Sequence, residues 1–227
     1  MKPVWWQPTS DPKYFEIHIQ ELRKQLQPSD PFLLASHTGA RFEQSTAGEG
    51  FFRLRVLQNS YRLSFPDFVA RLEETGEQAP LNLQALLLYY FHTSDGAPLS
   101  GRWISFSELP DGRFYNQAFQ GYTGKEVSRL FQNDLAAFEQ RASQEGGEPF
   151  RASQSPGDVA YRFQALPNTP LLLAYWLGDE DFPASCQVLF DASAPHYLPT
   201  DAYAILGSML THRLVHSKAS PPSLKDQ

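Results

Sequence analysis

Cysteine is almost absent from this sequence, and no apolar run is long enough to cross a membrane. Cys186 is the one cysteine among 227 residues, so the chain can form no internal disulfide and lacks the clustered ligands of a Cys/His zinc site. The longest apolar run lies around residues 86–91, whereas a membrane helix needs roughly 20 apolar residues. The first residues also lack the apolar segment of a signal peptide. We therefore predict a cytoplasmic protein that does not enter the membrane.

Charged residues are also few, and basic residues do not outnumber acidic ones. Charged residues make up 19% of the chain and the formal net charge is −6, which argues against a nucleic-acid partner. Hydrophobic residues make up 41% and aromatic residues 14%, a composition typical of a globular protein rather than a disordered one. We predict one domain over residues 31–216, with an N-terminal helical segment at 1–30 packed on it and a disordered tail at 217–227.

Apolar residues at helical spacing predict several helices. Residues 11–12 are typical of a helix start, and an apolar stripe follows at Phe15, Ile19, Leu22 and Leu26. Residues 83–92 are apolar nearly all round, which indicates a buried helix. A capping box that opens at Thr123 predicts a helix continuing to Phe138. Residues 199–201 begin the last helix.

Alternation of apolar and polar residues predicts the strands. Residues 51–56 and 61–65 alternate on either side of a turn, which indicates a β-hairpin with one buried face. Short apolar or alternating runs predict further strands at 32–36, 102–106, 161–165, 171–176 and 188–190. Residues 66–72 are expected to form a short helix, and residues 142–158 a loop. Together these elements predict an α+β fold with an antiparallel or mixed β-sheet and helices packed on one face and at the ends.

Three sequence blocks resemble a known family. They are GRWISFSELPDG at 101–112, YWLGDEDFPA at 175–184, and VLFD with YLPTD at 188–191 and 197–201. Over roughly residues 42–214 the chain is similar to the domain of unknown function 3786 family of bacterial and archaeal proteins. The resemblance implies a fold rather than an activity, because the family is uncharacterised. Some relatives carry a cysteine-rich iron–sulfur segment, which implies redox or corrinoid metabolism nearby, and this chain lacks that segment.

Aromatic residues gather in these blocks and in the ten residues after the first one, namely Trp103, Phe106, Phe114, Tyr115, Phe119, Tyr122 and Trp176. Aromatic side chains usually build a core, yet aromatic walls with a few polar groups are also typical of a ligand cleft. Our leading hypothesis is a non-catalytic module that binds a small ligand or cofactor. The predicted ligand-binding residues are Arg102, Trp103, Ser105, Trp176, Asp181 and His92. The cofactor is unknown; a tetrapyrrole or corrinoid would suit such a wall, with a histidine as axial ligand.

Two other classes of function stay open. A hydrolase could use Ser105 as nucleophile and His92 as base, oriented by Asp179 or Asp181, although no Gly-x-Ser-x-Gly elbow surrounds the serine. His92 is equally suited to a position at a helix C-terminus, where the helix dipole favours it. An exposed aromatic patch would instead indicate a protein-interaction or assembly module. No catalytic residue is assigned, and whether the protein is an enzyme is left open.

Three patterns of charged or histidine residues could bind ions, but each also has a simpler structural explanation. The acidic run at 179–181 could bind a hard cation, or be a solvated turn. His212 and His216 share a helix face, but two ligands make a poor metal site, and solvated histidines explain them as well. A guanidinium clamp for an anion, or the wet face of a sheet, could be formed by Arg53, Arg55 and Arg62. We predict no metal site.

Overall fold

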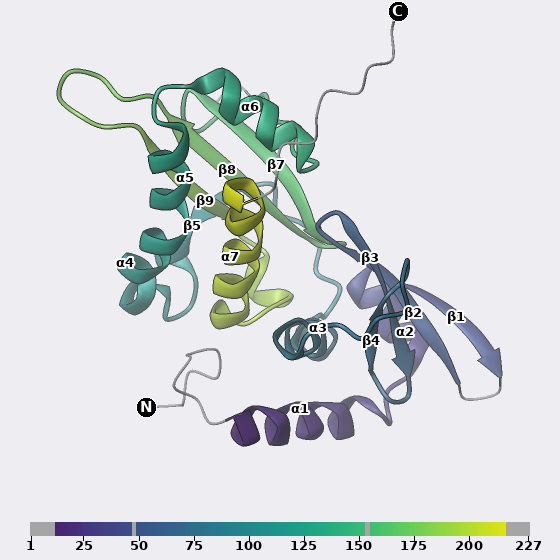
Figure 1. The fold of residues 1–227 in the computed structure, drawn as a ribbon. Helices are drawn as coiled ribbons and strands as arrows, with labels where there is room; N and C mark the ends of the chain where they lie inside the picture. The colour runs from purple at the N-terminus through teal and green to yellow at the C-terminus, as the bar shows by residue number, and fades with distance from the viewer. Residues whose placement is uncertain (1–11, 47–48, 153–154, 217–227) are drawn as a thin grey trace, which may run out of the picture.

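Two antiparallel sheets and a set of helices make up the fold (Figure 1). The computed structural model describes residues 12–46, 49–152 and 155–216. One sheet has four strands in the order β1-β2-β3-β4, and the other has five in the order β5-β9-β8-β7-β6. The predicted α+β class is therefore confirmed, with the strands divided between two sheets. Over the described ranges, the structure contains no helix of the length and apolar character that crossing a bilayer requires.

The first sheet comes from the predicted hairpin and its neighbours. Its strands are β1 (Arg41–Thr46), β2 (Glu49–Val56), β3 (Asn59–Phe65) and β4 (Ala70–Leu72). The hairpin is confirmed, and its alternation buries Phe52 opposite Leu63. Residues 66–72 were expected to be helical, and this prediction is wrong. The Phe68 N–H donates to the Ser64 carbonyl and the Val69 N–H to the Ser64 hydroxyl, so the chain turns back and pairs as β4.

The second sheet comes from the middle and C-terminal strands. They are β5 (Trp103–Ser105), β6 (Glu148–Pro149), β7 (Val159–Leu166), β8 (Thr169–Trp176) and β9 (Ser185–Asp191). The strands predicted within residues 102–190 are confirmed. Alternate side chains of β8 point to opposite faces of the sheet. Leu173 and Tyr175 join the main core, whereas Leu172 and Ala174 join a small cluster on the other face.

The first, third and last helices follow the predicted periodicity. They are α1 (Pro12–Leu26), α3 (Leu81–Thr93) and α7 (Thr200–His216). Helix α1 buries Ile19, Leu22 and Leu26 and packs against α3. The predicted cap at Asp11 and the predicted tail at 217–227 lie outside the described residues.

The segment expected as a strand at 32–36 is helical, which corrects the prediction. Helix α2 spans Pro31–Thr38. The Asp30 side chain accepts a hydrogen bond from the Phe32 N–H at 2.8 Å, and Pro31 occupies the first turn. Gly39 ends the helix with φ 68°. These start and stop residues decide the structure, because a short apolar run alone does not distinguish a strand from a helix.

The single helix predicted from Thr123 to Phe138 is also wrong. The chain forms α4 (Gly112–Tyr122), α5 (Gly124–Phe131) and α6 (Leu135–Gln144). The Thr123 hydroxyl donates to the Phe119 carbonyl of the preceding helix and makes no cap for α5. Gln132 has φ 48°, a conformation that ends α5. Helix α6 and strand β6 also occupy part of the predicted loop at 142–158.

One hydrophobic core joins the two sheets. Helices α5, α6 and α7 cover one face of the five-stranded sheet, and α3 lies between α1 and α7, beside the four-stranded sheet (Figure 1). The Leu57 N–H in the β2–β3 turn donates to the Ala165 carbonyl of β7 at 2.9 Å. The Tyr90 hydroxyl donates to the Thr38 carbonyl at 2.6 Å and accepts from the Asn168 N–H at 3.0 Å. These contacts fix the hairpin to β7, and α3 to α2 and to the β7–β8 turn.

Candidate functional site

A cleft opens where the β2–β3 hairpin faces the start of α3, one side of α4 and the middle and C-terminal part of α7. Its volume is about 880 Å³, within the range of 300–1,000 Å³ typical of small-molecule sites. We call it the tyrosine cleft. Its lining residues are Val56, Leu57, Asn59, Tyr61, Leu81, Asn82, Tyr115, Tyr122, Ala204, Ile205, Ser208, Met209, His212 and Arg213.

Helical spacing explains why α4 and α7 each contribute several residues to this cleft. Tyr115 and Tyr122 are seven residues apart, or two turns, so they lie on the same face of α4. Ile205, Ser208 and Met209 follow the same rule on α7, and His212 continues the row by one more turn. The α4 and α7 walls of the cleft therefore follow from ordinary helix periodicity.

Tyr122 is a neutral wall of the cleft, because its pKa is raised above the ordinary value. Burial raises the pKa of Tyr122, and its hydrogen bond with Tyr115 raises it further. Asp201, in the first turn of α7, adds to this effect by its negative charge. The pKa of Asp201 is itself raised to about 6, first by burial and then by the charge of Asp111. The cleft thus has apolar, hydrogen-bonding walls rather than a charged interior.

Polar groups gather at the C-terminal end of α7. Arg213 donates from Nε to the Glu145 carboxylate at 2.8 Å, and the Glu145 side chain is only 8% exposed. His212 is exposed and its ring stacks on His216, with centroids 4.2 Å apart. Stacked rings do not direct their nitrogens at one point, so the geometry favours solvated histidines over a metal pair. Within the ranges that the structure describes, no three His, Cys, Asp or Glu residues form a metal-binding group.

The two predicted indoles lie on a different surface from the cleft. Trp103 and Trp176 both pack on the small cluster of the outer sheet face, formed by Ala160, Leu172, Ala174 and Leu189. Phe150 completes this cover, with its ring centroid 5.8 Å from that of Trp103. Both indoles are half-buried, and neither lines the tyrosine cleft. The indoles cover apolar residues of the sheet.

The predicted serine and histidine are not brought together. The Ser105 N–H and hydroxyl donate to the Glu108 carboxylate at 2.7 and 2.8 Å, which caps the short helix η1 (Phe106–Glu108). The Ser105 hydroxyl also shares a hydrogen bond with Ser107. His92 is exposed in the last turn of α3, and in the described part of the chain no hydrogen bond joins it to Ser105. This geometry gives Ser105 a capping role and does not support the hydrolase hypothesis.

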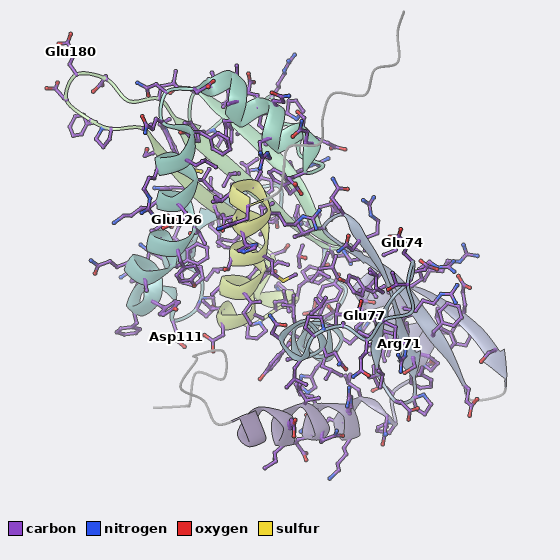
Figure 2. All side chains as sticks on the ribbon, viewed as in Figure 1. Arg71, Glu74, Glu77, Asp111, Glu126 and Glu180 are labelled. Carbon is purple, nitrogen blue, oxygen red and sulfur yellow. The ribbon has the colours of Figure 1, made fainter. Side chains whose placement is uncertain are left out.

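The remaining predicted residues lie on the surface. Arg102 is exposed next to β5, and Asp181 is exposed in the loop at 177–184 between β8 and β9. In that loop the Asp179 carboxylate accepts from the Asp181 and Phe182 N–H groups at 2.9 and 2.8 Å. Figure 2 shows Glu180 at the tip of this projecting loop, pointing away from the body. The acidic run is therefore a solvated turn of the kind that aspartate stabilises.

The three predicted arginines of the first sheet already have side-chain partners, and two of them are paired with carboxylates. Arg53 contacts Glu43 at 2.6 Å and Glu73 at 2.8 Å, and Arg62 contacts Glu73 at 3.1 Å. Arg55 donates to Gln58 at 3.2 Å. These pairs fit the wet face of a half-buried sheet rather than an open clamp for an anion.

Sequence reasoning missed most of the tyrosine cleft. Tyr115 and Tyr122 stood out as part of an aromatic cluster. The cleft needs residues from four segments at 56–61, 81–82, 115–122 and 204–213. No local motif marks such a set, because its members become neighbours only through the docking of the hairpin against α7.

Comparison with known proteins identifies the family but no function. The family model described as domain of unknown function (DUF3786) matches residues 30–213. No curated protein and no solved structure matches the chain. The match includes α2, both sheets and nearly all of α7, so it also includes every element that lines the tyrosine cleft. The chain therefore belongs to the domain of unknown function 3786 family.

Proposed function

We propose that this protein is a non-catalytic module that binds a small organic ligand in the tyrosine cleft. The observation that carries the proposal is the cleft itself, with its volume of about 880 Å³, its aromatic walls and a few polar groups at one end. That composition is typical of small-molecule sites, which also occur preferentially where two structural units meet. The cleft replaces the predicted site around Trp103 and Trp176, whose rings cover the sheet instead.

The lining indicates what kind of ligand the cleft would take. Tyr61, Tyr115 and Tyr122 offer flat apolar rings that carry hydrogen-bonding hydroxyls. His212 and Arg213 offer donors at the other end, and the ion pair of Arg213 with Glu145 uses only Nε of the guanidinium. These features favour a ligand with a flat apolar body and one polar or anionic end. The tetrapyrrole or corrinoid hypothesis stays a prediction, which visible absorbance of freshly purified protein tests.

Native mass spectrometry tests the proposal. The purified protein is equilibrated with a small-molecule extract of cells, desalted and weighed under native conditions. The wild-type protein is expected to keep a discrete extra mass. Ser208→Trp puts an indole into the cleft and is expected to abolish that mass.

The matched control is His216→Ala, which lies on the same helix but outside the cleft lining. This variant is expected to keep the extra mass. Circular dichroism of each variant checks that it is folded. An extra mass that survives Ser208→Trp in a folded protein, or no extra mass in the wild type, would overturn the proposal.

A further inference from the structure

A second cavity lies between α4, α5 and the loop at 177–184. Its volume is about 970 Å³, and it shares no lining residue with the tyrosine cleft. We call it the amide groove after the side-chain amides that line it, which are Asn116, Gln120, Gln132, Asn133 and Gln187. The groove is independent of the function proposed above.

The groove exists because β5 is shorter than β9. Strand β5 ends at Ser105, opposite Leu189, so among the described residues no strand pairs with 185–188 on that side. Helix α5 takes that place and packs Gly124 on the Cys186 carbonyl, where a Cβ atom would lie only 2.0 Å from the oxygen. The strand edge is covered at this point, which disfavours the addition of a peptide strand. The groove presents side chains instead.

Opposite charges at the groove offset one another, since Lys125 and Asp179 carry one charge each of opposite sign. Arg129 pairs with Glu126, which Figure 2 shows on α5. The Asp179 carboxylate is occupied by two backbone N–H groups of its own loop. Lys125 adds one cation. The side-chain amides and the serine hydroxyls both donate and accept hydrogen bonds, so the groove matches a neutral ligand whose groups also do both.

An exposed aromatic ring borders this polar surface. Phe182 is 71% exposed and lines the groove from the loop at 177–184. Asn133 ties the loop to the end of α5, since its side chain accepts from the Gly178 N–H at 2.7 Å and donates to the Gly178 carbonyl at 3.2 Å. The ring is therefore held in place beside the amides without being buried. The negative face of an aromatic ring attracts the partly positive C–H groups of a sugar ring.

We propose that the amide groove binds a short neutral oligosaccharide. One sugar ring stacks on Phe182, and its hydroxyl groups exchange hydrogen bonds with Gln187 and Asn116. The proposal rests on three observations together: the volume of the groove, its excess of neutral donor–acceptor groups, and an exposed ring fixed at its border.

NMR of the full-length protein tests this proposal. Side-chain amide signals of ¹⁵N-labelled protein are recorded during titration with maltotetraose, cellotetraose and tetra-N-acetylchitotetraose. At least one saccharide is expected to shift the signals of Gln187 and Asn116. Phe182→Ala is expected to raise its Kd about tenfold, the effect of losing ~1.4 kcal/mol of contact.

The control variant is Phe114→Ala, which removes a ring that is 93% exposed on α4 and outside the groove lining. It is expected to leave the Kd unchanged. The proposal is overturned if none of the three saccharides shifts these signals, or if Phe182→Ala binds as tightly as the wild type. It is equally overturned if a neutral peptide such as (Ser-Gln)4 shifts the same signals and the saccharides do not.

Discussion

Asp191 is a buried carboxylate that ties the segment before β5 to the end of β9. It accepts hydrogen bonds of 2.6 to 2.9 Å from backbone and hydroxyl groups of Ser100 and Ser193 and from the Gly101 N–H. Burial alone would raise its pKa, but the hydrogen bonds from Ser193 and Ser100 outweigh burial and hold the pKa below its ordinary value. The charged form is therefore the one that stabilises the fold.

Asp191→Asn is expected to destabilise the protein by about 2–4 kcal/mol at pH 7, because the new amide group faces donors that need an acceptor. Urea denaturation measures this loss. The wild-type advantage is present above the ordinary aspartate pKa and is lost as the pH falls through the lower folded-state value. Ser100→Ala, which removes one hydroxyl donor, should cost about 1 kcal/mol. Equal stability of Asp191→Asn and wild type at pH 7 would contradict this role.

The sequence indicated which types of residue could form the site, but not which individual residues do. The aromatic blocks pointed to Trp103 and Trp176 as well as to Tyr115 and Tyr122. Composition could not say which rings cover a sheet and which line a cleft, because both environments favour aromatic side chains. The pairing of His92 with Ser105 gains no support for a related reason: Glu108, three residues away, accepts hydrogen bonds from the serine.

At the scale of elements, periodicity predicted most of the longer strands and helices. The remaining elements depend on the residues at which a helix begins or ends. Residues 32–36 looked like a strand, but Asp30 and Gly39 supply the two ends of a helix. Residues 123–138 looked like one helix, but the backbone at Gln132 divides it. Nothing in the apolar pattern marks that division, since the apolar stripe continues on both sides.

Gln132 should be replaceable by glycine with a gain in stability. Its φ of 48° is strained for a residue with a Cβ and relaxed for glycine. We expect Gln132→Gly to stabilise the protein by about 1 kcal/mol in urea denaturation. This gain is the strain relieved in the folded protein minus the stability lost because glycine raises the entropy of the unfolded chain. Gln117→Gly, in the exposed interior of α4, should instead destabilise it by about 0.5–1 kcal/mol. The same sign for both variants would argue against strain at Gln132.

For the whole molecule, the decisive feature is that two separate sheets share one core. The sequence predicted the longer strands from residue 51 onward but not their division between sheets, because alternation shows which face is buried and not which strand lies beside it. The tyrosine cleft follows from that division, since it lies where the hairpin of one sheet meets the helices covering the other. The fold class was therefore predictable, whereas the site was not.

Global stability should depend on Asp201 at neutral pH. Its folded-state pKa of about 6 lies above the ordinary value, so the folded protein keeps a proton there that the unfolded chain has released. Stability thus falls as the pH rises from about 4 to 6. Asp201→Asn should be more stable than wild type at pH 7.5, by at most about 1 kcal/mol because the group is half-exposed and the α7 dipole favours its charge.

Urea denaturation at two pH values checks this prediction. The stability difference between Asp201→Asn and wild type should disappear near pH 4, where the carboxyl group is protonated in the folded protein. A constant difference at both pH values would show that the substitution acts through packing rather than through charge.

The methyl group of Met209 tests the proposed ligand site most directly. The sequence contains two methionines, Met1 and Met209, and Met209 lines the tyrosine cleft. Protein labelled with ¹³C-methyl methionine is mixed with the small-molecule extract that yields a bound mass. A ligand in the cleft should shift the Met209 methyl signal and leave that of Met1 in place. A bound mass that leaves the Met209 signal unchanged would contradict the proposed site.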